Sequence, residues 1–262
     1  MYYYSICAIA REEQLYLKDW VCSNLATGAE HFFIYDNGGS VPIKDTLKEY
    51  VDKGLVDVIP FPGKSGQMPC YTHCIFNHGS KTKWLGIFDC DEVLIPKKKE
   101  TVQDVLKDYE QFGGLNVSWK IFGSSGHKTR PEGLMMENYF DTIPTDHYEN
   151  THTKAIVQPA YTLRAGSNPH HCVFKPGYYA VSEDYKTVPN AWAPHVANKL
   201  QLNHYFLKSE EEFQIKIQRP RADAAHLEGR KFEDFERFDK LCTDKDYSAK
   251  RFVEKAKSLL IT

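Results

Sequence analysis

The sequence predicts an α/β protein with a mostly parallel, Rossmann-like sheet, helices on both faces and a second half rich in loops. Apolar runs of strand length alternate with stretches of helical spacing over the first 95 residues, which is typical of a parallel sheet. Polar side chains follow three of these runs, at the edge where parallel sheets bind ligands. Beyond about residue 128 the chain is rich in Pro, Gly, Asn, His and Tyr, which favours loops and short strands.

Length and composition bound the class of protein. The 262 residues are 42% hydrophobic, which is enough for one large domain. A net charge of −2 gives no argument for nucleic-acid binding, and no run approaches the ~20 apolar residues of a membrane span. Seven cysteines, an odd count without compact spacing, indicate reduced thiols. We therefore expect a single domain over residues 1–262 in the cytoplasm, without a nucleic-acid partner or a transmembrane segment. Peripheral contact with the inner face of the membrane is left open.

The first half alternates between predicted strands and helices. The strands predicted from apolar runs are residues 3–9, 31–35, 56–61 and 84–88. Helical spacing of apolar side chains is found at residues 17–27, 47–53 and 69–78. Gly28 and Gly54 are placed to end the first two helices.

The second half carries fewer regular signals. An N-capped helix is predicted over residues 101–109, and residues 115–121 alternate as a half-buried strand. Residues 209–212 form a capping box ahead of another helix, and residues 252–260 mark a closing amphipathic helix. We expect loops and short strands between about residues 128 and 203.

Two acids interrupt buried sequence at the end of the fourth predicted strand. Asp89 and Asp91 are two residues apart, so in extended chain they project to one side, about 6–7 Å apart. Such carboxylates repel unless positive charge lies between them, and a divalent cation with oxygen ligands is the natural candidate. Because burying unpaired charge is costly, the pattern favours a function. The alternative is that the acids face water or cap a turn.

Other polar residues follow the ends of other predicted strands. Arg11 and Glu12 follow the first, and Asp36 with Asn37 follows the second. Because the carboxyl ends of parallel strands meet at one edge, we expect these side chains on the same rim as the two acids. An alternative for Asp36 is an ordinary turn residue, since Asp-Asn-Gly is a strong turn signal.

A rival metal site lies on the third predicted helix. Cys70, His73, Cys74 and His78 share one face of it, and this combination of residue types suggests zinc. One helix presents two ligands to a tetrahedral ion easily, but four hardly at all. We therefore interpret these residues as a buried helix face.

Short motifs occur together along the chain in a fixed order. They are residues 10–13, 16–20, 28–37, 84–96, 118–127, 154–157, 170–171, 203–205 and 209–213. In this order, over about residues 5–220, they resemble glycosyltransferases with the GT-A fold, and more narrowly glycosyltransferase family 92. Arg11 departs from the pattern, because the family more often shows Lys-Asn before the Glu, which alters the donor contacts expected there.

The resemblance implies binding of a UDP-sugar and of Mn²⁺ or Mg²⁺. Asp91 would be a direct metal ligand, and Asp89 would bind the metal, directly or through a water, or the ribose. Asp36 would contact the uracil ring and the ribose. A late histidine would complete the metal site, with His171 favoured over His204 and a structural histidine as the alternative for each. The residues implied in donor binding are Ala10, Arg11, Glu12, Asp36, Gln67 and Asp89.

The resemblance further implies inversion at the anomeric carbon, which needs a carboxylate base. We favour Glu137, because Gly133, Glu137 and Tyr139 match the family's pattern. Glu132 and Asp141 are the alternatives.

Together these expectations describe a metal-dependent glycosyltransferase with a nucleotide-sugar half at about residues 1–95 and an acceptor half at about residues 96–262. It would transfer a hexose, galactose or a relative, from a UDP-sugar to a glycan or glycolipid in surface-polysaccharide synthesis. Trp119, Phe122 and His204 would bind the acceptor, with core packing as an equal alternative for the two aromatic residues.

Two other functions are left open. A non-catalytic carbohydrate- or nucleotide-binding module would keep the polar rim and lack the base. A nucleotidyltransferase also uses paired acids and a metal, but it would show a Gly-rich phosphate loop and a Lys near the first strand. Here the glycines at residues 63–66 follow the third predicted strand instead.

Overall fold

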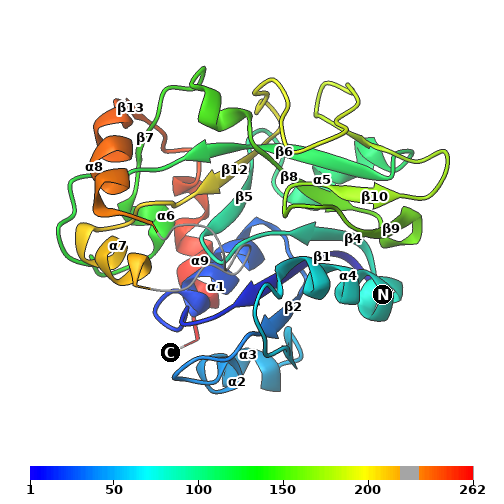
Figure 1. Cartoon of the computed structure of the whole chain (residues 1–262), viewed down its shortest axis with the longest axis horizontal. Helices are drawn as coiled ribbons and strands as arrows, with labels where there is room; N and C mark the ends of the chain where they lie inside the picture. The colour runs from blue at the N-terminus through cyan, green and yellow to red at the C-terminus, as the bar shows by residue number, and fades with distance from the viewer. Residues whose placement is uncertain (219–229, 262) are drawn as a thin grey trace.

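The computed structural model describes residues 1–218 and 230–261, which form a curled central sheet with helices around it (Figure 1). The strands lie in the order β3-β2-β1-β4-β8-β6-β12-β5, with β11 paired to β6. These strands are β1 (Tyr2–Ala10), β2 (His31–Asp36), β3 (Val56–Pro60), β4 (Thr82–Ile87), β5 (Glu92–Pro96), β6 (Gly114–Ile121), β8 (Thr153–Val157), β11 (Ala180–Val181) and β12 (Leu200–His204). The remaining strands are β7 (Asp141–Thr142), β9 (Thr162–Ala165), β10 (Cys172–Phe174) and β13 (Asp244–Lys245).

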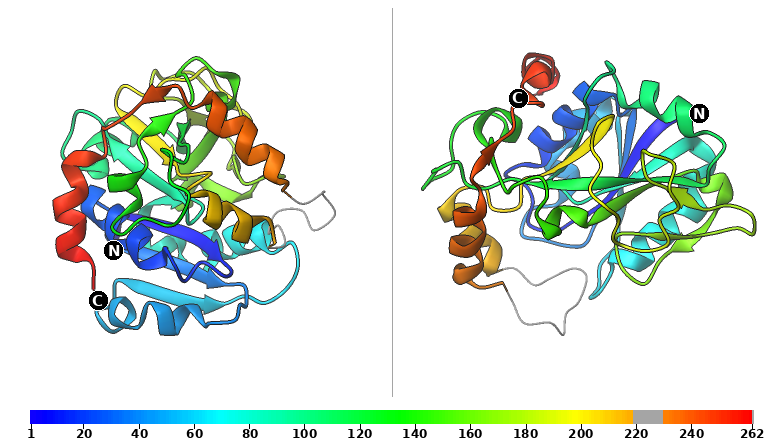
Figure 2. Two further views of the ribbon diagram at one scale, coloured as in Figure 1. Left: turned by 90° about the vertical axis from the view of Figure 1, so that its left-hand side faces the viewer. Right: turned by 90° about the horizontal axis from the view of Figure 1, so that it is seen from above.

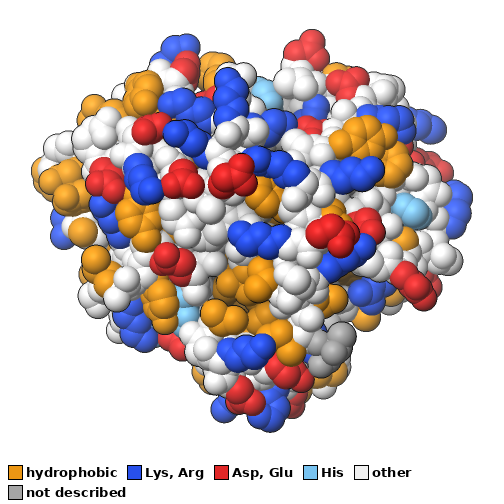
Figure 3. All heavy atoms as spheres, turned by 180° about the vertical axis from the view of Figure 1, so that it is seen from behind, with side chains coloured by type: hydrophobic (Ala, Val, Ile, Leu, Met, Phe, Trp, Pro, Cys, Tyr) orange, Lys and Arg blue, Asp and Glu red, His pale blue; other side chains and the backbone are white. Residues whose placement is uncertain are grey.

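The helices are mostly short. They are α1 (Leu17–Thr27), α2 (Ile43–Thr46), α3 (Lys48–Asp52), α4 (Gln67–His78), α5 (Val102–Leu106), α6 (Met135–Asn138), α7 (Glu210–Ile217), α8 (Phe232–Leu241) and α9 (Val253–Leu259). No helix in the described part of the chain is long and apolar enough to cross a membrane. The surface seen from behind mixes basic, acidic and apolar side chains, as expected for a nearly neutral chain (Figure 3).

Strands β1 to β4 are parallel, with β1 between β2 and β4. Ala10 is in register with Asp36, and Asp36 with Pro60, so these strands end along one rim. The pairings of β6 with β11 and β12 are also parallel. The predicted fold class, an α/β protein with a mostly parallel sheet, is therefore confirmed. The predicted helix at residues 47–53 begins earlier and is divided into α2 and α3.

The second half returns to the sheet in a way that curls it. Strand β8 is antiparallel to both of its neighbours, β4 and β6, and β5 is antiparallel to β12 at the edge. In a flat sheet β5 would lie about 19 Å from β4, four spacings of about 4.8 Å. The chain from Ile87 to Glu92 has five Cα steps, at most about 17 Å, and it contains a turn closed by Glu92 N–H to the Asp89 carbonyl at 3.1 Å. The sheet therefore curls, and residues 88–91 cross its opening.

Helices cover both faces of the sheet, as the two perpendicular views show (Figure 2). One apolar cluster includes α1 and α9, and the other includes α4 with the β9–β10 hairpin. On α4, Cys70 and Cys74 are buried in this second cluster, and His73 bonds to the Tyr35 hydroxyl at 2.8 Å. These contacts fit the interpretation of a packed helix face.

The capping signals in the second half are confirmed. Thr101 Oγ1 accepts the N–H of Asp104, and Ser209 with Glu212 forms a reciprocal capping box. The closing helix packs against α1, and the carbonyl of Leu259 accepts the Tyr50 hydroxyl at 3.0 Å. Helix α8 was not predicted, although its apolar side chains follow a helical pattern.

Candidate functional site

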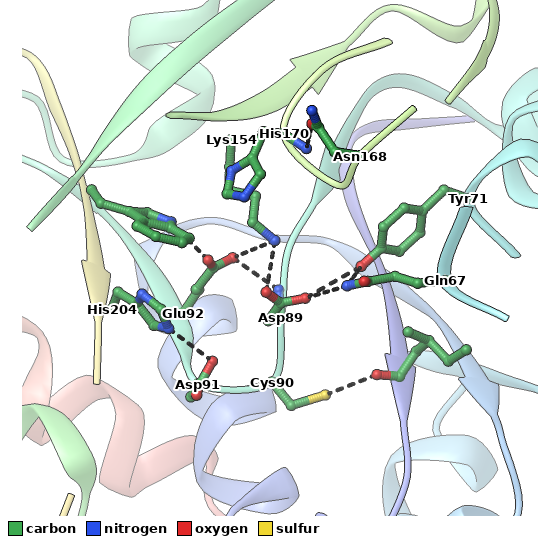
Figure 4. A network of polar contacts seen from close by, with 12 residues as sticks. Gln67, Tyr71, Asp89, Cys90, Asp91, Glu92, Lys154, Asn168, His170 and His204 are labelled. Atoms are coloured by element: carbon green, nitrogen blue, oxygen red, sulfur yellow. Dashed lines mark hydrogen bonds and ion pairs between the residues drawn. The ribbon is translucent and has the colours of Figure 1, made fainter. Parts of the chain in front are cut away.

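The two acids lie in the short loop between β4 and β5, at the opening of the curled sheet (Figure 4). Phe88 anchors the start of this loop in the core, and Glu92 begins β5 at its end. Because both ends are fixed by buried residues, Asp89 and Asp91 have defined positions. They face different partners, so the loop forms two adjacent polar centres.

Asp89 lies at the centre of the first group of contacts. Its Oδ1 accepts a hydrogen bond from Gln67 Nε2 at 2.9 Å and a longer one from the Tyr71 hydroxyl at 3.4 Å, both from α4. Its Oδ2 accepts the ammonium of Lys154 on β8 at 2.8 Å. Gln67 and Asp89, which the resemblance both implies in donor binding, are thus in contact, whereas roles for Tyr71 and Lys154 were not predicted.

Glu92 is fully buried behind Asp89. Its Oε2 accepts the backbone N–H of Asp89 at 2.9 Å, and its Oε1 accepts Trp119 Nε1 at 2.8 Å. Burial raises the pKa of Glu92 to about 8, because desolvation and the nearby acids outweigh the attraction of Lys154. Glu92 therefore joins the loop of residues 88–91, the acid loop, to Trp119 of β6.

Lys154 supplies the positive charge between these carboxylates. Its side chain is completely buried, and Nζ lies 2.8 Å from Asp89 and 3.4 Å from Glu92. Burial opposes the charged form, but the two acids outweigh burial and raise the pKa of Lys154. Lys154 and Asp89 both fall within motifs found in the sequence, but nothing local shows that residues 65 positions apart meet.

Asp91 forms the second centre. Its Oδ2 lies 2.9 Å from Lys216 Nζ of α7, and its Oδ1 lies 3.5 Å from His204 Nε2 of β12. Burial alone would raise the pKa of Asp91, but Lys216 and His204 hold it well below the ordinary value. Burial lowers the pKa of His204, although the nearby Asp91 carboxylate acts in the opposite direction. Burial also lowers the pKa of Lys216, and the positive charges of Arg230 and Lys208 add to this effect.

The predicted metal ligands do not assemble into one site. His171 bonds to Asn168 Oδ1 at 3.1 Å, and the histidine beside Asp91 is His204. Across residues 1–218 and 230–261, no group of three or more His, Cys, Asp and Glu side chains could hold a metal ion. Each acid of the pair instead has a lysine ammonium within 2.9 Å. The donor set in this arrangement fits ammonium groups and does not fit a divalent cation, which those ammonium groups would repel.

An aromatic cluster borders these acids. The Trp119 ring lies 5.1 Å from His152, 5.0 Å from His170 and 4.4 Å from His204, measured between ring centroids. Two of the predicted acceptor residues, Trp119 and His204, are thus brought together. Phe122 is not among them: it is 1% exposed and packs against Tyr205, so it offers no surface to an acceptor.

Glu12 and Asp36, two of the predicted rim residues, bond to the backbone of the turn after β2. Asp36 Oδ1 accepts the N–H of Gly38 at 2.9 Å, and its Oδ2 accepts that of Ile43 at 3.1 Å. Glu12 has a φ of 55° and accepts the N–H of Ser40 at 2.7 Å. Both carboxylates therefore stabilise the connection between β2 and α2. In this structure Asp36 acts as a turn residue, which was the alternative given for it. Ala10 and Arg11 lie on the same rim, as expected.

The predicted base lies apart from these centres. Glu137 is on α6, and its carboxylate pairs with Lys257 of α9 at 2.7 Å, with 36% of the side chain exposed. The alternative Asp141 pairs with Lys245 at 2.8 Å. None of the contacts described for Asp89, Asp91 or Trp119 involves these acids. Glu137 was chosen because its motif resembles the family. The motif does not show in which direction the four-residue helix α6 presents this side chain.

Comparison with known proteins places the chain in a family. The sequence matches the Glycosyltransferase family 92 domain over residues 2–236. The chain belongs to glycosyltransferase family 92, so the family predicted from the motifs is confirmed.

Relatives in plants share parts of this chain. A glycosyltransferase family 92 protein of Oryza sativa subsp. japonica is 28% identical over 161 residues, covering 59% of this chain and 26% of that protein. One of Ricinus communis is 27% identical over 222 residues, covering 82% of this chain and 37% of that protein. Galactan beta-1,4-galactosyltransferase GALS3 of Arabidopsis thaliana is 26% identical over 111 residues, covering 38% of this chain and 22% of that protein. The chain thus spans only 22% to 37% of the length of these relatives.

Among solved structures, residues 1–349 of S. aureus TarS align with a TM-score of 0.38 and 14% identity, covering 60% of this chain and 47% of that one.

Replacing Lys154 by Met tests the first centre. The variant leaves Asp89 without the buried ammonium that neutralises it, so the free energy of unfolding should fall by about 3–5 kcal/mol. Urea unfolding measures it. The matched control is Lys245→Met, which breaks the exposed pair with Asp141 and should change stability little. A Lys154→Met protein as stable as the control would show that the pair is not structural.

Glu92 should also make stability depend on pH. Its pKa is raised from an ordinary value of 4.5 to about 8, so between these values the folded state holds a proton that the unfolded state has released. The free energy of unfolding should therefore decrease as pH rises through this window, by up to about 1.4 kcal/mol per pH unit. Urea unfolding at pH 5.5, 6.5 and 7.5 measures the slope, and Glu92→Gln should flatten it. Parallel profiles for the two proteins would contradict this assignment.

Proposed function

We propose that this chain is a catalytic domain that transfers a hexose from a UDP-sugar to a glycan or glycolipid, with inversion at the anomeric carbon. Membership of the family supports glycosyl transfer. The name of one relative, a galactan beta-1,4-galactosyltransferase, supports galactose as the sugar. Because the chain spans only part of its relatives, the donor, acceptor and linkage are proposals for this domain.

One observation carries the proposal: the hydrogen bond from Trp119 Nε1 to Glu92 joins the aromatic cluster to the acid loop. A donor bound at the acid loop and an acceptor sugar beside Trp119 would therefore lie next to each other. Indole and imidazole rings offer apolar faces to a sugar ring, while polar groups at their edges orient its hydroxyls. Gln67, which bonds to Asp89, would contact the donor.

In this proposal, the residues supply position and charge. The acceptor hydroxyl attacks the anomeric carbon, the bond to the phosphate oxygen breaks, and a base takes the hydroxyl proton. Lys154 and Glu92 hold Asp89 and Trp119 in place, which keeps the two reacting groups aligned. Dependence on Mn²⁺ or Mg²⁺ stays a prediction, as do a cytoplasmic location and the inner membrane face as a site of contact.

Asp91→Asn tests the proposal. The variant removes the charge that Lys216 and His204 neutralise, so transfer from UDP-sugars to glycan acceptors should fall at least about 100-fold. Released UDP and product glycan are measured together. Asp52→Asn, which breaks an exposed pair with Lys48, is the control. A folded Asp91→Asn protein with full activity would refute the role of this loop, and wild type without turnover on any donor would favour a non-catalytic binding module.

Glu137→Gln tests the predicted base. If Glu137 takes the acceptor proton, turnover should fall by about 100-fold or more while UDP binding is unchanged. The matched control is Glu49→Gln, which removes another partly exposed acid paired with a lysine. Equal turnover in both variants and wild type would remove Glu137 from the mechanism.

A further inference from the structure

An exposed indole lies next to the aromatic cluster around Trp119. Of the four tryptophans in the chain, Trp20 and Trp84 are fully buried in the core, whereas Trp192 is 53% exposed. Trp192 lies in the connection between β11 and β12, residues 182–199, which the structure describes in full and which holds no helix or strand apart from isolated bridges. Connections longer than about 12–15 residues without such elements commonly carry function.

Trp192 is held in place through both its backbone and its side chain. It forms an isolated antiparallel bridge with His152, and beside it the N–H of Ala193 donates to the Thr151 carbonyl at 3.0 Å. Its indole Nε1 donates to His152 Nε2 at 3.0 Å. An exposed side chain without such contacts samples several rotamers, and ordering it on binding costs free energy. The indole of Trp192 is instead fixed before any ligand binds.

His152 connects this indole to Trp119. Its Nδ1 lies 3.1 Å from the Glu149 carbonyl, so Nδ1 carries the proton and Nε2 is the acceptor that the indole N–H requires. The imidazole stacks on Trp119 with 5.1 Å between ring centroids, and its centroid lies 5.6 Å from that of Trp192. The two indoles are therefore at most about 11 Å apart, the sum of these two spacings. One short glycan can reach both.

The groups around Trp192 suit a neutral sugar. The exposed part of the indole offers an apolar face to the C–H groups of a sugar ring. Asn190 is exposed, and its Oδ1 accepts the backbone N–H of Trp192 at 3.1 Å. In the described part of the chain its Nδ2 has no partner, which leaves a donor for a sugar hydroxyl. The described contacts of Trp192 and His152 involve no lysine or arginine, so they do not favour an anionic ligand.

We propose that Trp192 binds a sugar of the acceptor beyond the one that reacts, so that the domain prefers an oligosaccharide to a single sugar. The inference rests on the proposed function, because it takes the reacting sugar to lie beside Trp119. Binding of the remote sugar then holds the reacting hydroxyl in position, which favours transfer to longer chains. Trp192 does not touch the reacting atoms, so it acts as a specificity-determining residue.

Kinetics with acceptors of increasing length test the inference. Wild type is assayed with UDP-sugars and with unbranched mono-, di-, tri- and tetrasaccharides of galactose, glucose and N-acetylglucosamine. Its KM should fall as an accepted glycan becomes longer. Trp192→Ala should raise KM for the longer acceptors about 3- to 10-fold, while KM for the monosaccharide and for the UDP-sugar stays unchanged. Trp192→Phe keeps a ring but loses the bond to His152, so its KM should lie between the two.

The matched control is Tyr247→Ala. Tyr247 is also 53% exposed, and it stacks on Phe140 instead of the cluster around Trp119. Its removal should leave the preference for longer acceptors unchanged. Equal KM values for acceptors of all lengths, or a length preference that survives Trp192→Ala, would overturn the inference and leave the proposed glycosyl transfer intact.

A binding measurement separates the inference from the proposed function, and it does not depend on the folding of Trp192→Ala. In protein labelled with 5-fluorotryptophan, the fluorine NMR signal of Trp192 is assigned by its loss in Trp192→Phe. The tetrasaccharides should include one that shifts this signal, while the signals of the buried Trp20 and Trp84 stay in place.

The outcomes of the two measurements are distinct. Turnover on long acceptors without a shift at Trp192 would overturn the inference alone. A shift at Trp192 without turnover on any donor would support a glycan site there and overturn the proposed reaction. Neither turnover nor a shift with any of these glycans would overturn both.

Discussion

The ion pair of Lys154 with Asp89 is the contact on which the rest of the site depends. The ammonium is wholly buried and also approaches Glu92, which is itself fully buried. A buried ammonium is costly without a partner, and it is tolerated here because Asp89 neutralises it and Glu92 lies within 3.4 Å of it. The position of Lys154 follows from the sheet, since β8 lies between β4 and β6 and points its lysine into the curl. The position of β8 in the sheet thus brings Lys154 to Asp89, and the ion pair in turn stabilises β8 in that position.

This arrangement makes the two halves of the protein interdependent. Gln67 of α4 holds one side of Asp89, and Glu92 holds its backbone on the other side. Through Trp119, Glu92 reaches the second half of the chain. Since β5 pairs with β12 while β4 pairs with β1 and β8, the loop that joins β4 to β5 carries both acids across the opening. A change in one half therefore shifts the groups that face the other.

The sequence could predict those features whose cause is local. Alternation of apolar runs gives the parallel half, and capping residues such as Thr101 and Ser209 mark helix starts because their side chains bond within one turn. The partners of the acids could not be predicted in this way. Choosing between His171 and His204 depends on the register of β12 on β5, which pairs His204 with Glu92 and so brings it close to Asp91. The burial of Phe122 and the pairing of Glu137 with Lys257 could not be predicted either, because packing and helix direction are set by distant segments.

A pair of acids at a strand end predicts a counter-charge, but it does not identify the counter-charge. Coulomb attraction is satisfied by a divalent ion or by ammonium groups, and the local sequence is the same in both cases. Here the ammonium groups come from residues 65 and 125 positions away, one on β8 and one on α7. The two acids have different partners: Asp89 closes a buried network with α4 and β8, whereas Asp91 pairs with the Lys216 ammonium of α7. The motif therefore indicated the correct place in the fold, while its chemistry depends on which distant side chains the fold brings to each carboxylate.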